Sequence, residues 1–225
     1  MEVLRRIQAL PADWPTAGSL RPAVLARLAH HASAREVRRS AETGTGKSTL
    51  LFSHLSRRHS VFTLDDAGAG DSLATVRSSP LLAPGGVEFV VGPSQRTLPA
   101  HRFEGPLDVV LIDGAHAFPF PHLDYYFLYP ELAPEGLLVV DDVHVRSVND
   151  LFRFLSTDEM FDLLEVVHTT AFFRRTAHAT FDPAGDGWWL QRYNRSVRPL
   201  PAGLSWSETL KTLARRISGR RAGIA

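Results

Sequence analysis

Apolar and polar positions along the chain alternate with two different periods, one typical of short strands and the other of amphipathic helices. Segments typical of strands lie at residues 35–43, 60–66, 87–92, 107–116 and 135–144. Segments with helical spacing lie between them, at residues 46–58, 72–82, 121–133 and 147–160. Strands that alternate with helices at this spacing predict an α/β protein with a doubly wound, mostly parallel sheet. The run LDVVLIDGAH is apolar nearly throughout, so this strand is expected to be buried on both faces.

The two ends of the chain depart from this alternation. Residues 163–176 and 187–193 are strand-like runs with no clear helix between them, and they predict an antiparallel hairpin at one edge of the sheet. Residues 1–34 read as helices interrupted by Pro11, Pro15 and Pro22. Residues 207–225 read as a basic amphipathic helix with a frayed end.

Composition narrows the classes of protein that the chain can belong to. A length of 225 residues suits one α/β domain with extensions, and a formal net charge of +1 gives no global field toward nucleic acid or a membrane. The absence of cysteine excludes disulfides and thiolate chemistry. With no signal sequence and no apolar run of membrane-spanning length, we expect a cytoplasmic protein with neither a nucleic-acid nor a membrane partner.

The stretch SAETGTGKS (residues 40–48) resembles a phosphate-binding loop only in part. Gly46, Lys47 and Ser48 fit the pattern G-x-x-x-x-G-K-[ST], but Ala41 stands where its first glycine belongs. Glu42 would also bring a carboxylate to a loop meant for polyphosphate, where like charges repel. A nucleotide hydrolase or kinase that uses Lys47, Ser48 and Asp113 is therefore the weaker interpretation.

The same stretch fits a nucleoside-binding turn better. A strand would end at Glu42, and Gly44 and Gly46 would let the backbone turn tightly toward a ligand before a helix begins near Ser48. About twenty residues further on, a second strand ends at Asp65, the position from which an acid binds ribose hydroxyls. A nucleoside that carries an amino group and a sulfonium would make a carboxylate favourable here.

These residues resemble the class I S-adenosyl-L-methionine-dependent methyltransferases over positions 35–193. AETGTGKS is similar to their first motif, and VLIDGAH followed by LLVVDDVH is similar to a subgroup of Mg²⁺-dependent small-molecule O-methyltransferases that tailor macrolide sugars, rhamnosyl groups and cephalosporins. The resemblance implies a Rossmann-like fold and a cofactor site. That site would comprise Glu42, Thr43, Gly44, Gly46, Ser48, Asp65, Asp66, Ser94, Gln95 and Asp113.

The resemblance also implies a metal site and a base. Asp113, Asp141 and Asp142 would hold Mg²⁺, and His116 would act as general base, with His144 as a second candidate. Hard carboxylate oxygens suit Mg²⁺, and a histidine has a pKa suited to accepting a proton from a hydroxyl. The carboxyl ends of neighbouring parallel strands face one crevice, so these residues can converge although 28 positions separate Asp113 from Asp141.

The resemblance divides the chain into three parts: a helical lid or homo-oligomer contact at 1–34, a methyltransferase core at 35–195 and a basic helix and tail at 196–225. The expected reaction is O-methylation of a hydroxyl on a small polar or glycosylated metabolite. A cofactor-binding regulator without catalysis remains an alternative. So do structural roles for single residues, because Asp113 can cap a turn and Asp141 and Asp142 can cap the next helix.

Overall fold

The computed structural model describes residues 2–15, 19–65, 72–178 and 191–195. The chain divides into two compact units. The first comprises residues 1–156 and 161–177 and holds the sheet, while the second comprises residues 157–160 and 178–225. The described part of the second unit contains the short helix η4 (Arg192–Arg195) and an ion pair between His178 and Glu159 at 3.2 Å.

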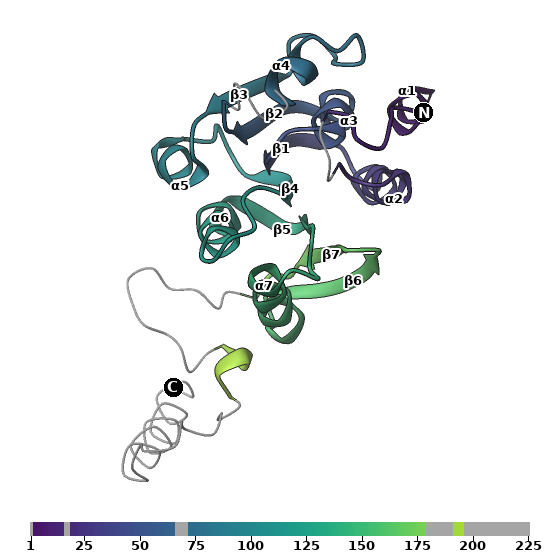
Figure 1. Cartoon of the computed structure of the whole chain (residues 1–225). Helices are drawn as coiled ribbons and strands as arrows, with labels where there is room; N and C mark the ends of the chain where they lie inside the picture. Colours follow the sequence, from purple (N-terminus) through teal and green to yellow (C-terminus); the bar gives the residue numbers. More distant parts are fainter. Residues whose placement is uncertain (1, 16–18, 66–71, 179–190, 196–225) are drawn as a thin grey trace, which may run out of the picture. The chain divides into compact units, whose positions relative to one another are not determined.

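A seven-stranded sheet forms the centre of the first unit (Figure 1). Its strands are β1 (Val37–Thr43), β2 (Ser56–Thr63), β3 (Val87–Val91), β4 (Leu107–Ile112), β5 (Leu132–Val140), β6 (Phe161–Val167) and β7 (Thr170–Arg175). Their order is β3-β2-β1-β4-β5-β7-β6. The strands from β3 to β5 pair in parallel, and β7 pairs antiparallel with both β5 and β6. The prediction of a mostly parallel sheet with an antiparallel edge is confirmed.

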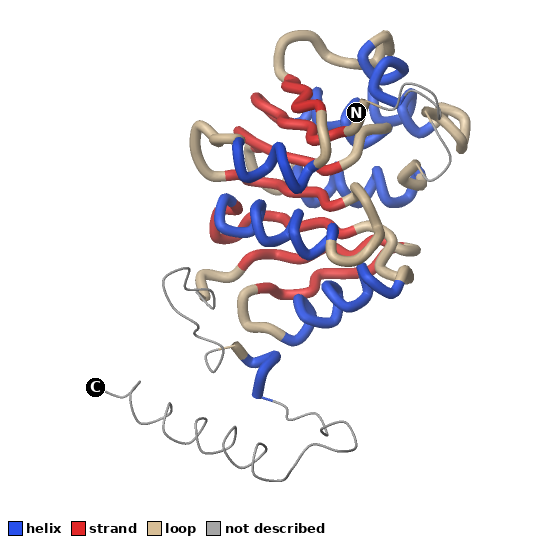
Figure 2. Tube along the Cα trace, turned by 60° about the vertical axis from the view of Figure 1, so that its left-hand side comes forward, coloured by secondary structure: helices blue, strands red, loops and turns tan. Residues whose placement is uncertain are grey.

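Helices lie on both sides of this sheet (Figure 2). They are α1 (Glu2–Gln8), α2 (Pro22–Ala32), α3 (Lys47–Leu55), α4 (Ser72–Arg77), α5 (Ser94–Thr97), α6 (Phe120–Leu128) and α7 (Arg146–Thr157), with the 3-10 turns η1 (Leu98–Ala100) and η2 (Tyr129–Glu131). One apolar cluster joins α1, α2, α3 and α4 to alternate residues of β4, β5 and β7. None of the described helices combines the length and apolar character that crossing a bilayer requires.

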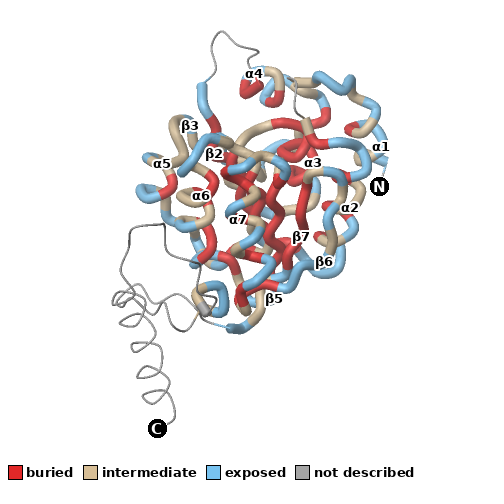
Figure 3. The backbone as a smooth tube through the Cα atoms, turned by 60° about the horizontal axis from the view of Figure 1, so that its bottom comes forward, coloured by how far each residue is buried: buried red, intermediate tan, exposed pale blue. Residues whose placement is uncertain are grey.

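The central strands are buried on both faces (Figure 3). In β4, Val109 and Leu111 belong to the cluster beneath α2 and α3, whereas Val110 and Ile112 point to the opposite face because strand side chains alternate. Both sets are at most 3% exposed, which explains the unbroken apolar run in the sequence.

Several boundaries differ from those expected. β2 begins at Ser56 rather than residue 60, because Ser56 already pairs with Val37 of β1 although Arg57 and Arg58 give the segment a polar character. β5 likewise begins at Leu132, which pairs with Leu107 before the register shifts. In both cases, pairing with a neighbouring strand decides the boundary.

The edge hairpin was expected between the wrong residues. Its strands are β6 and β7, which both lie within 161–175, and the turn between them contains His168 with a left-handed φ of 54°. The second strand expected, 187–193, falls largely outside the described residues, and its last described part belongs to η4. The basic tail 207–225 also lies outside them. The apolar run at residues 163–176 was expected to form one strand, whereas it folds back on itself and contributes to both β6 and β7.

Polar contacts attach the N-terminal helices to the sheet. Glu165 of β6 accepts hydrogen bonds from Arg27 at 2.7 Å and pairs with His31 at 2.5 Å, both from α2. These contacts oppose desolvation and lower the pKa of Glu165. Helix α2 thus packs against β6 within the first unit. The role of residues 1–34 as a lid or oligomer contact stays a prediction, as do the proposed domain boundaries.

Candidate active site

The carboxyl ends of β1, β2, β4 and β5 carry the residues that the sequence singled out. Backbone hydrogen bonds continue past the strand ends: Gly44 donates to Phe62 at 2.9 Å, Asp113 donates to Thr43 at 3.2 Å and Asp141 donates to Ile112 at 3.0 Å. The hydrogen-bond pattern of the sheet therefore continues into the first residue after β1, β4 and β5. Side chains from separate parts of the sequence converge at this edge, as expected for a parallel sheet.

A pocket of about 540 Å³ opens at this edge. Its lining includes the glycine loop, the ends of β2 and β3, the turn after β4 and two residues of the N-terminal segment: Ser19, Leu20, Thr43–Ser48, Phe62–Leu64, Ser72, Gly92–Gln95, Asp113–His116, Phe120 and Asp142. Its size falls in the range of small-molecule and cofactor sites. Polar side chains outnumber apolar ones in its lining, and Leu20, Phe62, Leu64 and Phe120 are the large apolar residues among them.

Glycine is required at position 44. Gly44 has a left-handed φ of 92°, and a Cβ atom built there would lie 2.2 Å from the carbonyl oxygen of Asp113. The loop after β1 and the turn after β4 can approach this closely only because position 44 has no side chain. The two loops thereby form one continuous wall of the pocket.

Glu42 lies beneath the glycine loop rather than on the pocket surface. It is fully buried, and its Oε1 accepts hydrogen bonds from the hydroxyl of Thr49 and from His59 at 3.1 Å. Thr49 in turn accepts from the backbone N–H of Gly46 at 3.0 Å. Glu42 therefore fixes the start of α3 through Thr49. Its other oxygen, Oε2, has no hydrogen-bond partner among the described residues.

Lys47 lines the pocket, but its ammonium group is not presented to a ligand there as that of a phosphate-binding lysine would be. Its ammonium group donates to the carbonyl oxygens of Leu10 at 3.2 Å and Pro11 at 2.7 Å, and the residue is 2% exposed. Burial lowers the pKa of Lys47, although the charge of Asp13 opposes this. The lysine anchors the N-terminal segment to α3, so the phosphate-loop interpretation is not favoured.

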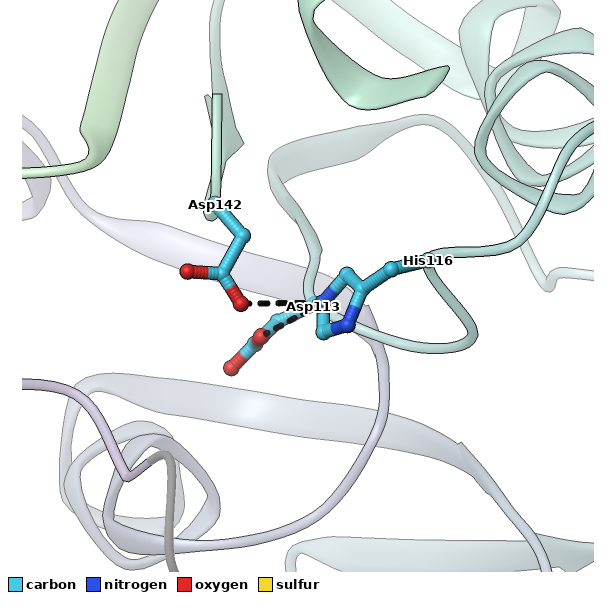
Figure 4. A group of neighbouring side chains, drawn as sticks. All are labelled: Asp113, His116 and Asp142. Carbon is cyan, nitrogen blue, oxygen red and sulfur yellow. Dashed lines mark ion pairs between the residues drawn. The ribbon is translucent and has the colours of Figure 1, made fainter. Parts of the chain in front are cut away.

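Three titratable side chains meet at the pocket edge (Figure 4). The Nε2 atom of His116 lies 3.2 Å from Oδ2 of Asp142 and 3.9 Å from Oδ1 of Asp113. One potential ligand atom from each lies within 4.8 Å of the other two. Nε2 of His116 is buried and makes no well-formed hydrogen bond with the described residues. Two carboxylates thus surround a ring nitrogen that is available to bind a proton or a cation.

The local backbone holds this group in place. Asp142 adopts a left-handed φ of 55°, a conformation that aspartate tolerates better than most residues. The carbonyl oxygen of His116 accepts a hydrogen bond from the hydroxyl of Ser147 at the start of α7. Strand end and helix start therefore position the two side chains from opposite sides.

The charges of Asp113, His116 and Asp142 favour one positive charge, a proton or a cation, held among the three side chains. Burial raises the pKa of Asp113 to about 7, with Asp141 adding to the effect and His116 opposing it. The carboxylate of Asp113 raises the pKa of His116, with Asp142 adding to the effect and burial opposing it. These shifts are typical of groups that exchange a proton with a ligand.

Asp141 lies apart from this group, and His144 contacts it only through Asp142. Asp141 is 5% exposed and its Oδ1 accepts a hydrogen bond from Thr170 at 2.5 Å, so it ties β5 to β7 and does not line the pocket. The metal ligands expected were Asp113, Asp141 and Asp142, whereas the described residues bring Asp113 and Asp142 together with His116. His144 is exposed, with its Nδ1 atom 3.5 Å from Asp142.

Only some of the residues expected to bind the nucleoside line the pocket. Ser94 and Gln95 line the pocket from α5, a helix that the sequence did not predict. Asp65 is exposed and follows the lining residue Leu64, and Asp66 lies outside the described residues. Thr43, Gly44, Gly46 and Ser48 all line the pocket.

Sequence reasoning missed Asp124 of α6. It is fully buried and neither carboxylate oxygen makes a well-formed hydrogen bond with the described residues. The hydroxyls of Ser94 and Thr43 lie nearby and lower its pKa, but burial has the larger effect and raises the pKa of Asp124. An acid among the aromatic residues of FPHLDYYFL is the only sequence signal that could have revealed it.

Replacing Asp124 by asparagine should stabilise the protein increasingly as pH rises. The raised pKa means that the folded state binds the proton more tightly than the unfolded state, so wild-type stability falls as pH rises from the unfolded value of about 4 through the folded pKa. The variant lacks this titration and should gain about 1–2 kcal/mol at pH 8. Urea unfolding at pH 5 and pH 8 measures the difference. The exposed Asp150→Asn is the matched control, and equal pH dependence in wild type and Asp124→Asn would contradict the prediction.

Comparisons with known proteins agree with this geometry. Residues 41–143 match a family model described as a methyltransferase domain, whereas a search of curated proteins found no match. Among solved structures, the O-methyltransferase TomG from Streptomyces achromogenes, involved in tomaymycin synthesis and solved with S-adenosylmethionine, has a TM-score of 0.61 at 17% identity. The alignment covers 79% of this chain and 91% of TomG.

Two further structures share the fold. The O-methyltransferase from Bacillus cereus, in complex with S-adenosylhomocysteine, has a TM-score of 0.57 at 17% identity and covers 78% of this chain and 89% of its own. The methyltransferase PaMTH1 from Podospora anserina, bound to S-adenosylhomocysteine, has a TM-score of 0.55 at 16% identity and covers 79% and 87%. Residues 41–143 thus match a methyltransferase-domain model, and the chain shares the Rossmann-like fold of these methyltransferase structures.

Proposed function

We propose that the protein is an S-adenosylmethionine-dependent O-methyltransferase that acts on a hydroxyl group of a small polar metabolite in the cytoplasm. The observation that carries the proposal is the 540 Å³ pocket, in which a glycine loop after β1 stands beside Asp113, His116 and Asp142. A nucleoside pocket and a proton-accepting group at one sheet edge are the two parts that methyl transfer to oxygen requires.

The cofactor would lie along the glycine loop, where Thr43, Gly44 and Gly46 offer backbone groups and no bulky side chain. Ser94 and Gln95 would face its adenine, and Asp65 its ribose. Glu42 would act from beneath: its buried negative charge favours a cationic ligand, and its bond to Thr49 fixes the loop. S-adenosylmethionine supplies a methyl group on a positively charged sulfur, which a nucleophilic oxygen attacks in line.

His116 would accept the proton of the attacking hydroxyl. His116 lines the pocket, and the carboxylates of Asp113 and Asp142 beside its Nε2 atom would stabilise the positive charge that the ring gains. The proton leaves the acceptor oxygen for His116 as the new O–C bond forms. A positioned base of this kind contributes about 10²- to 10⁴-fold in rate.

We propose Mg²⁺ as an additional component, with Asp113 and Asp142 as its ligands. The donor set fits in part, because two carboxylates converge but the third expected, Asp141, is committed to Thr170. A divalent ion here would lower the pKa of an acceptor hydroxyl. His116 would then either remain the base or complete the ligand set.

Calorimetry tests the cofactor. We expect S-adenosylhomocysteine to bind, and ATP with Mg²⁺ to give no heat, because Lys47 is held by Leu10 and Pro11. Binding of ATP with no binding of S-adenosylhomocysteine would overturn the proposal in favour of a nucleotide hydrolase or kinase.

A methyl-transfer screen tests the reaction. Polyhydroxylated natural products are offered with labelled S-adenosylmethionine, with and without a chelator. Turnover that the chelator abolishes supports both the reaction and the metal, and turnover that survives it removes the metal from the proposal. Cofactor binding with no turnover on any acceptor would favour a regulator that has lost catalysis.

A further inference from the structure

A second pocket lies beside the first strands and shares no lining residue with the cofactor pocket. Its volume is about 390 Å³, and its walls come from β1, β2, the start of β3 and the loop before β4. Three arginines line it, Arg39, Arg58 and Arg102, together with His101 and Phe103. We call it the arginine pocket.

The two strand arginines are direct neighbours. Arg39 of β1 and Arg58 of β2 are register partners in a parallel pair, so their side chains leave the same face from strands about 4.8 Å apart. Like charges in this arrangement repel each other. A pair of this kind costs stability unless an anion neutralises it.

No acidic side chain of the described residues supplies that anion. Neither guanidinium group forms an ion pair within this part of the chain, although Glu88 and Glu104 stand at the pocket rim. Glu88 instead lies 4.0 Å from His101 and 3.4 Å from the hydroxyl of Ser60. The Nε atom of Arg39 is buried and has no hydrogen-bond partner among the described residues. A buried donor of this kind normally has a partner.

The loop over Arg39 is shaped around its guanidinium group. A Cβ atom built at Gly105 would lie 3.0 Å from Nη1 and 3.1 Å from Cζ of Arg39. Any side chain at position 105 would therefore displace the arginine. The ring of His101 packs against Phe103 at 4.5 Å and Phe62 at 5.1 Å, which holds the loop in place.

From these observations we propose that the arginine pocket binds a small organic anion through a phosphate or carboxylate group. Guanidinium groups bind both groups with paired hydrogen bonds, and the volume suits a metabolite-sized ligand. Arg39 and Arg58 would bind the anionic group, and Arg102 at the exposed rim would add to the attraction. This site is independent of the proposed methyl transfer.

The test compares two double variants with the same loss of charge. Arg39→Gln with Arg58→Gln removes the proposed ligands, and Arg38→Gln with Arg57→Gln is the control on the same strands, where both arginines pair with Glu36. The probes are inorganic phosphate, pyrophosphate and citrate, each against sodium chloride of equal ionic strength. We expect saturable thermal stabilisation by at least one probe, retained in the control and weakened at least about tenfold in apparent affinity in the first variant.

The anion that binds most tightly identifies the group: phosphate and pyrophosphate for a phosphorylated ligand, citrate for a carboxylate. Stabilisation no greater than that by sodium chloride, or equal loss in both double variants, would overturn the proposal. The single variant Arg58→Gln changes an exposed position and is expected to fold, so it shows whether a loss of binding in the double variant reflects misfolding. Without a probe it should melt about 1–2 °C above wild type because repulsion is relieved. A lower melting temperature would mean that Arg58 has an internal partner and would count against the site.

Binding of S-adenosylhomocysteine separates this proposal from the proposed function. The first double variant should bind it as the wild type does, because neither arginine lines the cofactor pocket. If the wild-type protein binds phosphate but not S-adenosylhomocysteine, the methyltransferase proposal is contradicted and the proposal of an anion site in the arginine pocket is not.

Discussion

Replacing His116 by asparagine should lower kcat for methyl transfer about 10²- to 10⁴-fold while S-adenosylhomocysteine binds with nearly unchanged affinity. The imidazole is the proposed proton acceptor, an asparagine amide cannot accept a proton in its place, and the neighbouring carboxylates of Asp113 and Asp142 are the proposed Mg²⁺ ligands. The measurement is the initial rate of labelled methyl transfer to the best acceptor, with cofactor binding followed by calorimetry.

The control is His168→Asn in the turn between β6 and β7. His168 is exposed, lies outside the pocket and has a φ of 54°, which asparagine adopts readily. Its substitution should leave kcat unchanged. Equal rates in wild type and His116→Asn would remove His116 from the mechanism.

A magnesium titration of His116→Asn separates the two roles open to His116. If His116 is the base, kcat falls while the magnesium concentration for half-maximal rate stays the same, because both carboxylate ligands remain. If His116 is a ligand, that concentration rises and excess magnesium restores part of the rate. The geometry of two oxygens and one nitrogen within 4.8 Å accommodates either role, so the titration decides between them.

Replacing Gly44 by alanine should lower the free energy of unfolding by about 3–4 kcal/mol and weaken S-adenosylhomocysteine binding at least about tenfold. Two separate costs add. The left-handed φ of 92° disfavours any side chain, and the new Cβ atom would lie 2.2 Å from the carbonyl oxygen of Asp113. The loops after β1 and β4 must then move apart, which opens the pocket wall.

Gly85→Ala is the matched control for the first of these costs. Gly85 has a φ of 85°, but nothing lies within 4 Å of a Cβ atom built there. It should cost only the backbone strain of about 1–2 kcal/mol and leave cofactor binding unchanged. Urea unfolding of both variants measures the difference. A Gly44 variant no less stable than the Gly85 variant would show that the two loops can separate freely.

The alternation of polar and apolar residues by itself determined the architecture. Strands and helices of the observed type occur near most of the expected positions, because burial on a sheet or on one helix face imposes the period that the sequence displays. It also determined that Thr43, Asp113 and Asp142 approach one edge, because the carboxyl ends of parallel strands share it. The boundaries and the hairpin turn at His168 depended on pairing with neighbouring strands, which no local pattern contains.

Only the tertiary structure decided which of these side chains reach the pocket. Asp141 and Asp142 are adjacent in sequence, yet strand alternation sends Asp141 to Thr170, while a left-handed turn brings Asp142 to His116. Burial of Glu42 against Thr49 and His59 follows from contacts with α3 and β2 that the loop sequence does not show. The sheet fixes where residues can meet, whereas the path of the backbone and the packing beneath it fix which atoms do.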